Sequence, residues 1–397
     1  MNSKQNLRLS STVIQKCATY FNILAVISVV EYDYCPNRLF KLLSSLKKDT
    51  FAPNDRIIFH FDDTEYYIDQ KYGVILHNIQ KILYKLDIPN YFCIMLTHQD
   101  HRGPETIDVQ KLYGHDPYRI GTIYSWIDVD VGIDAVKSIE LNLHQIEKSF
   151  TYLSRITRKH RIALFSLLHN KNILDRGLIS FSLNEQSSQI ITSDLLDEDI
   201  PYIDFITISP FNRCNENWLI NSDKLKSTYD TFLKSVTPDF SYKNFVESTP
   251  ESNCWLYHNT IIIQKGFLYI TNETMMSYPG IYLTEKSFKG IKVKRPFVML
   301  GPMGNLKKLK SYGFQTFDRW WDESYDNIQD PADRIEAVYK IIYDISQKST
   351  NQLIALGKDM ESVLNYNYNF FINEFDERHL QNIDSQCLAN LQRSKND

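Results

Sequence analysis

A short stretch of the chain brings an acidic and a basic side chain together at the predicted start of a helix. Thr284 can cap a helix that opens with Glu285 and Lys286. The free N–H groups and partial positive charge of such a helix start favour a phosphate, and Lys286 adds a full positive charge. Glu285 can accept hydrogen bonds from paired hydroxyls, as on a ribose or a sugar ring. The stretch predicts a diphosphate site, and the alternative is a solvated helix with an ordinary Glu–Lys pair.

Basic residues surround this stretch although the whole chain is acidic. The formal net charge is -4 and the pI is near 6.2, which argues against stable binding of nucleic acid in general. The nearby basic residues are Lys289, Lys292, Lys294, Arg295, Lys307, Lys308 and Lys310. This local positive charge favours an anionic ligand.

Strand and helix patterns alternate around the stretch. An apolar run at residues 267–270 leads through a polar bend at residues 271–274 to the helix that begins after Thr284. A second apolar run at residues 296–300 ends in a Gly-Pro-Met-Gly turn, and a short helix from Asn305 to Gly313 follows. Such alternation is typical of a parallel α/β sheet, whose ligands bind at the carboxyl ends of the strands beside helix starts.

Two motifs in this half of the chain resemble a known family. YLTEKSFKG at residues 282–290, followed by RPFVMLGPMG at residues 295–304, is similar to the Y-x-T-E-K…P-x-x-x-G segment of α-1,3-fucosyltransferase-like enzymes of the GT-B fold. The continuation at residues 306–334 resembles bacterial and viral glycosyltransferase-like proteins, in which a G-F-x-T-F…D-E-S-Y-D run follows. The resemblance covers residues 151–334 and says much less about the first half.

The resemblance implies a fucosyltransferase-like hexosyltransferase that moves a sugar from a nucleotide-sugar to an acceptor hydroxyl. It implies Arg158 or Arg161 on the diphosphate, because a basic helix start is unfavourable unless an anion binds there. The other implied donor-binding residues are Asn272, Glu273, Thr274, Tyr282, Thr284, Glu285 and Lys286. The family's E-N-S is replaced here by Asn272, Glu273 and Thr274, so neither fucose nor GDP is assigned.

The first half of the chain is also β-α-β in character. Apolar runs predict strands at residues 22–30, 56–61 and 91–96, with helical spacing at residues 39–46 and 74–86. Polar groups follow the second and third strands: His60, Asp62, Asp63 and Glu65, then His98, Asp100, His101 and Glu105. Inverting glycosyl transfer needs a carboxylate that takes the acceptor proton. We expect this catalytic base to be Asp62, Asp63, Asp100 or Glu105, and the alternative for each is a polar loop tip.

Asp128 and Asp130 form a D-x-D pair that suggests a different mechanism. In the other large glycosyltransferase fold such a pair holds Mg²⁺ or Mn²⁺ against a diphosphate, because hard oxygen ligands suit these ions. Apolar residues alternate with the pair in residues 127–133, so a strand with its Asp face in water explains the pattern as well. We favour the strand or a linker, and we expect no metal and no cofactor besides the nucleotide-sugar co-substrate.

Composition sets the class of protein. With 397 residues the chain has room for two domains, and 43% hydrophobic with 23% charged residues is an ordinary globular composition. Six cysteines show no metal-ligand spacing and are typical of a reduced cytoplasmic protein. The apolar run at residues 21–30 is too short to span a bilayer, so we expect no membrane span.

These patterns predict an α/β, GT-B-like fold with two Rossmann-like domains facing a cleft. Residues 1–148 would form the acceptor-side domain, residues 149–349 the nucleotide-sugar donor domain and residues 350–397 a helical segment. In GT-B enzymes a terminal helix crosses back onto the first domain, and we expect residues 360–375 in that place. The predicted function is an inverting, metal-independent glycosyltransferase acting on a glycan or another hydroxyl acceptor. The alternatives are a non-catalytic carbohydrate-binding protein on a transferase scaffold and a metal-dependent transferase using Asp128 and Asp130.

Overall fold

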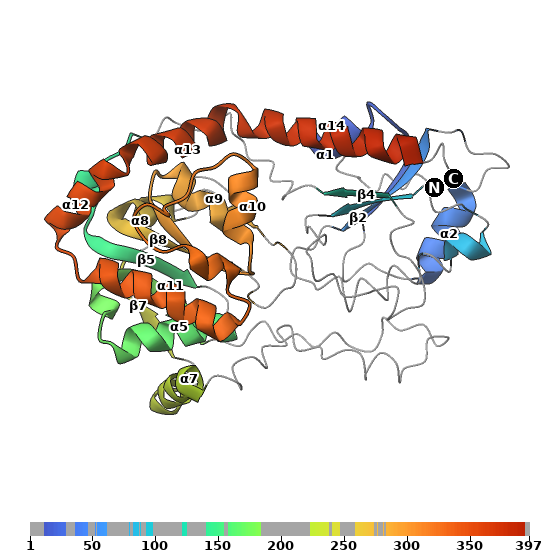
Figure 1. Cartoon of the computed structure of the whole chain (residues 1–397). Coiled ribbons are helices and arrows are strands. Elements are labelled where there is room, and N and C mark those ends of the chain that lie inside the picture. The colour runs from blue at the N-terminus through green and yellow to red at the C-terminus, as the bar shows by residue number, and fades with distance from the viewer. Residues whose placement is uncertain are drawn as a thin grey trace. The chain divides into compact units, whose positions relative to one another are not determined.

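The chain forms two compact α/β units. The computed structural model describes residues 12–28, 36–46, 52, 54–61, 79, 82–86, 88, 93–97, 121–124, 140–154, 158–183, 223–237, 240–246, 259–273, 276, 281 and 283–393. Unit 1 contains the described residues of 1–130 and of 377–393, and unit 2 contains those of 131–189 and 214–376 (Figure 1). Each unit is described by itself below.

Unit 1 is built on a parallel sheet. Its strands are β1 (Asn22–Ser28), β2 (Asp55–Phe61), β3 (Cys93–Thr97) and β4 (Gly121–Tyr124), in the order β1-β2-β3-β4. Every neighbouring pair is parallel. The first three strands and the helix α2 (Pro36–Leu46) were predicted from apolar runs and helical spacing, and these predictions are confirmed. The short strand β4 was not predicted.

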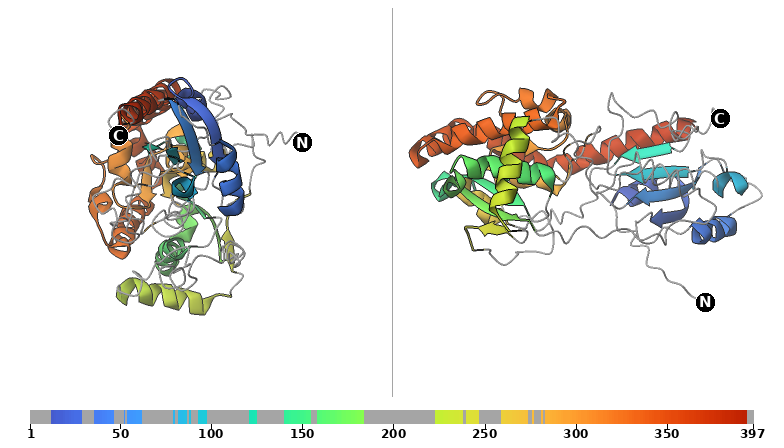
Figure 2. Two further views of the ribbon diagram at one scale, coloured as in Figure 1. Left: turned by 90° about the vertical axis from the view of Figure 1, so that its right-hand side faces the viewer. Right: turned by 90° about the horizontal axis from the view of Figure 1, so that it is seen from below.

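The last described helix lies in unit 1 except for its first two residues. Helix α14 (Phe375–Arg393) contributes Ile383 and Cys387 to a buried cluster that also contains residues of helix α1 (Thr12–Cys17), β2 and β3. Figure 1 and Figure 2 show α14 running beside α1. The segment that we expected in this place, residues 360–375, instead packs within unit 2, where Phe371 of helix α13 (Glu361–Asn373) stacks on Phe288 at 5.5 Å between ring centres.

Unit 2 is built on a mixed sheet that is mostly parallel. Its strands are β5 (Lys148–Ser154), β6 (Gly177–Ser182), β7 (Ser241–Lys243), β8 (Gly266–Asn272) and β9 (Phe297–Leu300), in the order β7-β6-β5-β8-β9. Only β7 is antiparallel among these described strands. All seven residues of β8 are buried, as expected for a strand covered on both faces.

The connections of unit 2 reverse direction next to β5. The chain leaves β5 through helix α5 (Lys159–Asn170) and enters β6 on one side, and later it enters β8 on the other side of β5 before continuing to β9. The carboxyl ends of β5 and β8 therefore flank a topological switch point. Open α/β sheets bind their ligands at such points.

Helix starts and stops in unit 2 follow local sequence signals. Thr284 caps helix α9 (Glu285–Lys292), and Asp330 caps helix α11 (Pro331–Ser346), which has Pro at its first position. Helix α10 (Asn305–Ser311) ends before Gly313, which has a φ of 107° that favours glycine. The predicted cap at Thr284 and the predicted short helix from Asn305 are confirmed.

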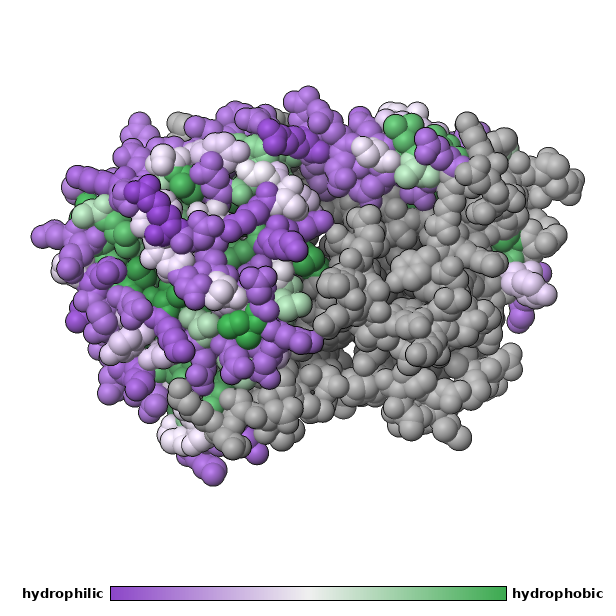
Figure 3. All heavy atoms as spheres, in the orientation of Figure 1, coloured by the Kyte–Doolittle hydropathy of each residue, from purple (hydrophilic) through white to green (hydrophobic). Residues whose placement is uncertain are grey.

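The remaining helices of unit 2 complete its layers. They are α7 (Asp223–Ser235), α8 (Thr260–Lys265) and α12 (Thr350–Asp359). Helix α7 packs on α5 through Phe232 and Phe165, whose ring centres are 5.3 Å apart. Hydrophilic residues cover most of the described surface in Figure 3. None of the helices in the described ranges is long and apolar enough to cross a membrane.

Candidate functional site

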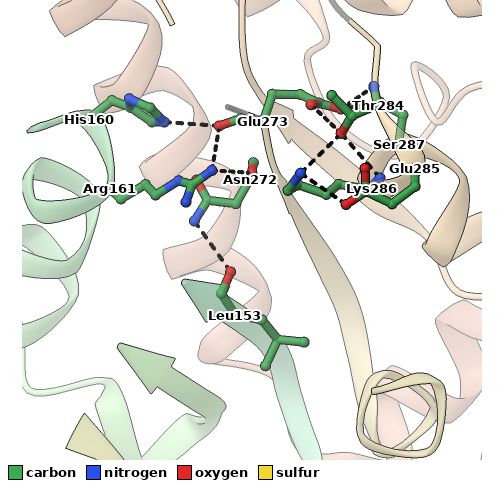
Figure 4. Close-up of polar contacts among 9 residues, drawn as sticks. All are labelled: Leu153, His160, Arg161, Asn272, Glu273, Thr284, Glu285, Lys286 and Ser287. Atoms are coloured by element: carbon green, nitrogen blue, oxygen red, sulfur yellow. Dashed lines mark hydrogen bonds and ion pairs between the residues drawn. The ribbon is translucent and has the colours of Figure 1, made fainter. Parts of the chain in front are cut away.

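The candidate site lies where β5 and β8 end and where α5 and α9 begin. Strand β8 ends at Asn272, and Glu273 follows it directly. Figure 4 shows Glu273 between Arg161 of α5 and the first turn of α9. The structure thus brings together residues more than 110 positions apart in the sequence, from both sides of the switch point.

The carboxylate of Glu273 is fully buried and accepts three hydrogen bonds from the start of α9. Its Oε1 accepts from the backbone N–H of Thr284 at 3.1 Å and from the hydroxyl of Ser287 at 2.5 Å, and its Oε2 accepts from the hydroxyl of Thr284 at 2.7 Å. The residue is 0% exposed. We predicted Glu273 near a sugar, whereas these contacts give its carboxylate a structural place beneath α9.

Burial perturbs the titration of this carboxyl. Loss of water raises the pKa of Glu273 above its ordinary value, although Lys286 and the hydrogen bonds from Ser287 and Thr284 act in the opposite direction. The nearby charge of Glu285 raises the pKa further. The balance follows the rule that desolvation disfavours the charged form and that donors and cations favour it.

Glu285 and Lys286 form an ion pair on the outer side of the same turn. The Lys286 Nζ lies 2.9 Å from the Glu285 Oε1, and the two side chains are 28% and 18% exposed. Burial acts to raise the pKa of Glu285, but Lys286 and Lys289 outweigh it, so the pKa lies below its ordinary value. Glu285 is therefore charged near neutral pH, and both side chains are partly exposed, as we expected for a helix start.

The backbone N–H groups at the start of α9 already have protein acceptors. The N–H of Thr284 donates to Glu273, that of Lys286 donates to the Thr284 hydroxyl at 3.3 Å, and that of Ser287 donates to the Thr284 carbonyl at 3.0 Å. We predicted free N–H groups here for a phosphate, and for these three groups the prediction is wrong. The buried carboxylate of Glu273 takes the N–H of Thr284, and the hydroxyl and carbonyl of the capping Thr284 take the other two.

Helix α5 begins with basic residues and no acid. Arg158 occupies the N-cap position without capping the helix through its side chain, and Lys159, His160 and Arg161 follow. The guanidinium of Arg161 donates to the carbonyls of Asn272 at 3.1 Å and of Glu273 at 3.0 Å. The His160 Nε2 lies 3.1 Å from the same Glu273 carbonyl. Of the two arginines predicted at a diphosphate, Arg161 thus ties α5 to the end of β8.

One buried acceptor lies unsatisfied at the ends of the central strands. Tyr152 of β5 pairs with Ile270 of β8, so two residues later Ser154 and Asn272 end neighbouring strands. Each is 2% exposed. The Ser154 hydroxyl interacts with the hydroxyl of Tyr152, whereas within the described part of the chain the Asn272 Oδ1 has no hydrogen-bond partner. Buried polar groups are normally paired, so the Asn272 Oδ1 is an acceptor open to a polar guest.

A second group of residues braces the turn after β9. The Asp326 carboxylate accepts from the N–H groups of Leu306 at 3.0 Å and Lys307 at 2.9 Å, at the start of α10. Arg334 donates to the carbonyls of Gly301 at 3.1 Å and Met276 at 2.7 Å. Sequence reasoning placed both residues in the resembling range 306–334 but missed these roles, because no local signal links residues 19 to 58 positions apart.

Several predicted residues lie outside the described ranges. They are the four candidate bases Asp62, Asp63, Asp100 and Glu105, the donor-site residues Thr274 and Tyr282, and the alternative metal pair Asp128 and Asp130. Among the residues that the structure does describe, no group of three or more His, Cys, Asp or Glu could hold a metal ion.

Comparison with known proteins adds no relative. No protein-family model matches the chain, and neither a curated protein nor a solved structure matches it. The resemblance to fucosyltransferase-like enzymes therefore stays a prediction carried by the motifs alone.

Proposed function

We propose that this protein is a GT-B-like glycosyltransferase and that the corner at the switch point of unit 2 binds its nucleotide-sugar donor. The observation that supports this proposal most strongly is the partly exposed Glu285–Lys286 pair. It lies at a helix start beside the carboxyl ends of β5 and β8. Ligands of open α/β sheets bind at such a place. The similarity of YLTEKSFKG to the donor-domain segment of fucosyltransferase-like enzymes supports the same reading.

The charges of the corner suit a diphosphate linked to a hydroxyl-rich group. Lys286 and the basic first turn of α5 would bind the diphosphate by charge and by hydrogen bonds. Glu285 would accept hydrogen bonds from ribose or sugar hydroxyls. Since three N–H groups of the α9 start are already occupied, we assign the diphosphate to these side chains rather than to that backbone.

A buried acceptor supports a polar guest at the same place. The Asn272 Oδ1 lies at the end of β8 and is not paired within the described ranges. A ligand that offers an N–H or O–H group would satisfy it, at a gain typical of a buried hydrogen bond, about 1 kcal/mol.

The proposed reaction is inverting transfer without a metal. A carboxylate of the first half would take the proton of the acceptor hydroxyl as that oxygen attacks the sugar C1 and the bond to the diphosphate breaks. Positive side chains, Lys286 with Arg158 or Arg161, would stabilise the negative charge that grows on the leaving diphosphate. We place this enzyme in the cytoplasm and propose a glycan or another hydroxyl compound as the acceptor.

A screen by thermal shift tests the proposal. The protein and its Lys286→Ala variant are heated with GDP-, UDP-, CMP- and dTDP-sugars. A donor at one hundred times its dissociation constant adds about 2.7 kcal/mol of stability, so we expect one nucleotide class to raise the Tm of the protein and not that of the variant. Binding without release of the nucleoside diphosphate in the presence of varied acceptors would favour the non-catalytic carbohydrate-binding alternative. No shift with any donor would refute the proposal.

A further inference from the structure

Glu273 links four elements of unit 2 through one residue. Its N–H donates to the Leu300 carbonyl of β9 at 2.9 Å, and its own carbonyl accepts from Arg161 of α5. Its side chain holds Thr284 and Ser287 at the start of α9, while the residue itself follows β8. A side chain so placed can set the geometry of the exposed turn above it.

We propose that Glu273 is the positioning residue of this corner: its carboxylate orients the Thr284 hydroxyl, and that hydroxyl in turn orients Lys286. The effect on donor binding rests on the proposed function. The orientation of Lys286 by Glu273 is a property of the protein without a ligand. It assigns Glu273 an indirect role, in place of the contact with a sugar that its sequence position suggested.

The orientation of Lys286 depends on the single hydrogen of the Thr284 hydroxyl. That hydrogen is donated to the Glu273 Oε2, which lies 2.7 Å away. The lone pairs of the same oxygen are then directed to the N–H of Lys286 and to its Nζ, each at 3.3 Å. A hydroxyl has one donor and two acceptor positions. The carboxylate thus fixes which way the hydroxyl points, and Lys286 is bound at both its backbone and its side chain.

An amide in place of the carboxylate breaks this chain of contacts. Glutamine has one acceptor oxygen and one NH₂ group. If its oxygen keeps the donors from Thr284 N and Ser287, its NH₂ group faces the Thr284 hydroxyl, whose hydrogen must then rotate away. The rotated hydroxyl no longer presents both lone pairs to Lys286. The size of the side chain is unchanged, so the substitution tests orientation rather than packing.

Glu323 offers a matched control in the same unit. Its buried carboxylate also accepts from a threonine hydroxyl, Thr316 at 2.5 Å, and from a backbone N–H, Phe317 at 2.7 Å. It pairs with Lys310 at 3.2 Å, and neither Thr316 nor Phe317 belongs to α9. Glu323→Gln therefore removes the same kind of contact away from the corner.

The first measurement needs no ligand. Backbone amide hydrogen exchange of the full chain is compared for the protein, Glu273→Gln and Glu323→Gln. We expect the amides of Lys286 and Ser287 to exchange about tenfold faster in Glu273→Gln, because local opening of that turn becomes easier. In Glu323→Gln they should keep the rate of the unaltered protein. Equal rates at α9 in all three proteins would overturn the inference, whatever the protein binds.

The second measurement uses GDP and UDP as probes in calorimetry. We expect the affinity for the nucleotide that binds to fall about tenfold in Glu273→Gln, as for loss of a charge-assisted contact, and to stay unchanged in Glu323→Gln. Faster exchange at α9 with unchanged nucleotide affinity would overturn the positioning role. Faster exchange in a protein that binds neither nucleotide nor any nucleotide-sugar would support the orientation of Lys286 and refute the proposed function instead.

A pH profile separates positioning from a merely structural role. Because burial raises the pKa of Glu273, we expect affinity to fall as pH drops through that pKa, when the protonated carboxyl stops accepting from Thr284. The charged and titratable groups facing Glu273 are Glu285 and Lys286 of α9, His160 and Arg161 of α5, and Tyr269 of β8. The unaltered protein and Glu273→Gln share these groups. The pH profile of affinity of Glu273→Gln should therefore lack only the change caused by titration of Glu273. Identical profiles would contradict the inference.

Discussion

Buried carboxylates of unit 2 accept hydrogen bonds from neighbouring turns, whereas the Glu285–Lys286 ion pair is partly exposed. Glu273, Glu323 and Asp326 each accept from backbone N–H groups, and the first two also accept from a threonine hydroxyl. Glu285 and Lys286, by contrast, pair with each other, and Lys286 also donates to the Thr284 hydroxyl, while both side chains stay partly exposed. Residues of the two kinds should respond differently to substitution.

Loss of either member of the exposed pair should weaken donor binding and leave the fold intact. We expect Lys286→Ala and Glu285→Ala to reduce the free energy of nucleotide-sugar binding by about 1.5–3 kcal/mol each, the range for charge-assisted hydrogen bonds. An exposed ion pair contributes only about 0–1 kcal/mol to folding. Calorimetry gives the first quantity and urea unfolding gives the second. Unchanged donor affinity in both variants would show that the corner is not the donor site.

The buried carboxylates predict an unusual dependence of stability on pH. Desolvation raises the pKa of Glu273, of Glu323 and of Asp326 in the folded protein. Between the unfolded value of about 4 and these raised values the folded state binds more protons, so the free energy of unfolding rises as pH falls. We expect urea unfolding to show this rise as the pH falls through the raised pKa values toward the unfolded value. Glu273→Gln should reduce the rise, and an equal rise in that variant would contradict the assignment.

At the scale of elements, the turn between β9 and α10 packs directly on the corner. A Cβ at Gly301 would lie 2.9 Å from the Asn305 Nδ2 and 3.1 Å from the Cβ and Cγ of Glu273. Arg334 holds the Gly301 carbonyl at the same time. Neither the turn nor Glu273 can move without loss of hydrogen bonds.

An alanine at Gly301 should therefore destabilise unit 2. We expect Gly301→Ala to cost about 1–3 kcal/mol, the usual range for overpacking, and to weaken nucleotide binding through displacement of Glu273. Gly357→Ala is the control, because its Cβ would meet only the side chain of Leu143, at 2.7 Å from Cδ2, and that side chain can rotate. Denaturant unfolding measures both variants. A smaller loss in Gly301→Ala than in Gly357→Ala would show that the turn tolerates the added methyl group.

The elements also show which features follow from sequence. The caps at Thr284 and Asp330 were predictable because a cap and its helix lie within a few residues of each other. The strand β8 was predictable as a continuous apolar run. The carboxylate of Glu273 beneath α9 was not, since the contact depends on how two elements pack. Helix α7 was not predicted, because the sequence around it is poor in pattern and its buried face is formed by packing on α5.

At the scale of the whole molecule, catalysis by the proposed mechanism needs a base from the first half. We expect one of Asp62→Asn, Asp63→Asn, Asp100→Asn or Glu105→Gln to keep donor binding and to lose about 10²–10⁴-fold in turnover. Rate measurements with the donor found by thermal shift decide this. Normal turnover in all four variants would show that none of these four residues is the catalytic base.

The charge of the donor corner also predicts activity without a divalent metal. Lys286 with Arg158 or Arg161 can neutralise the leaving diphosphate, so we expect turnover to persist in excess EDTA. Two carboxylates at Asp128 and Asp130 would instead repel a diphosphate unless a cation lay between them. Activity lost to the chelator, restored by Mn²⁺ and absent in Asp128→Asn and Asp130→Asn would support the metal-dependent alternative.

The place of α14 has a consequence for how the chain is made. A ribosome delivers β1 to β4 first, yet Ile58 and Ile94 of that sheet share a buried cluster with Ile383 and Cys387. Before those last residues emerge, the strands and helices of unit 2 have all been synthesised, and domains generally fold as units during synthesis. Unit 1, although its sheet is translated first, therefore has to keep part of its apolar surface in contact with solvent or chaperones until Ile383 and Cys387 have been synthesised.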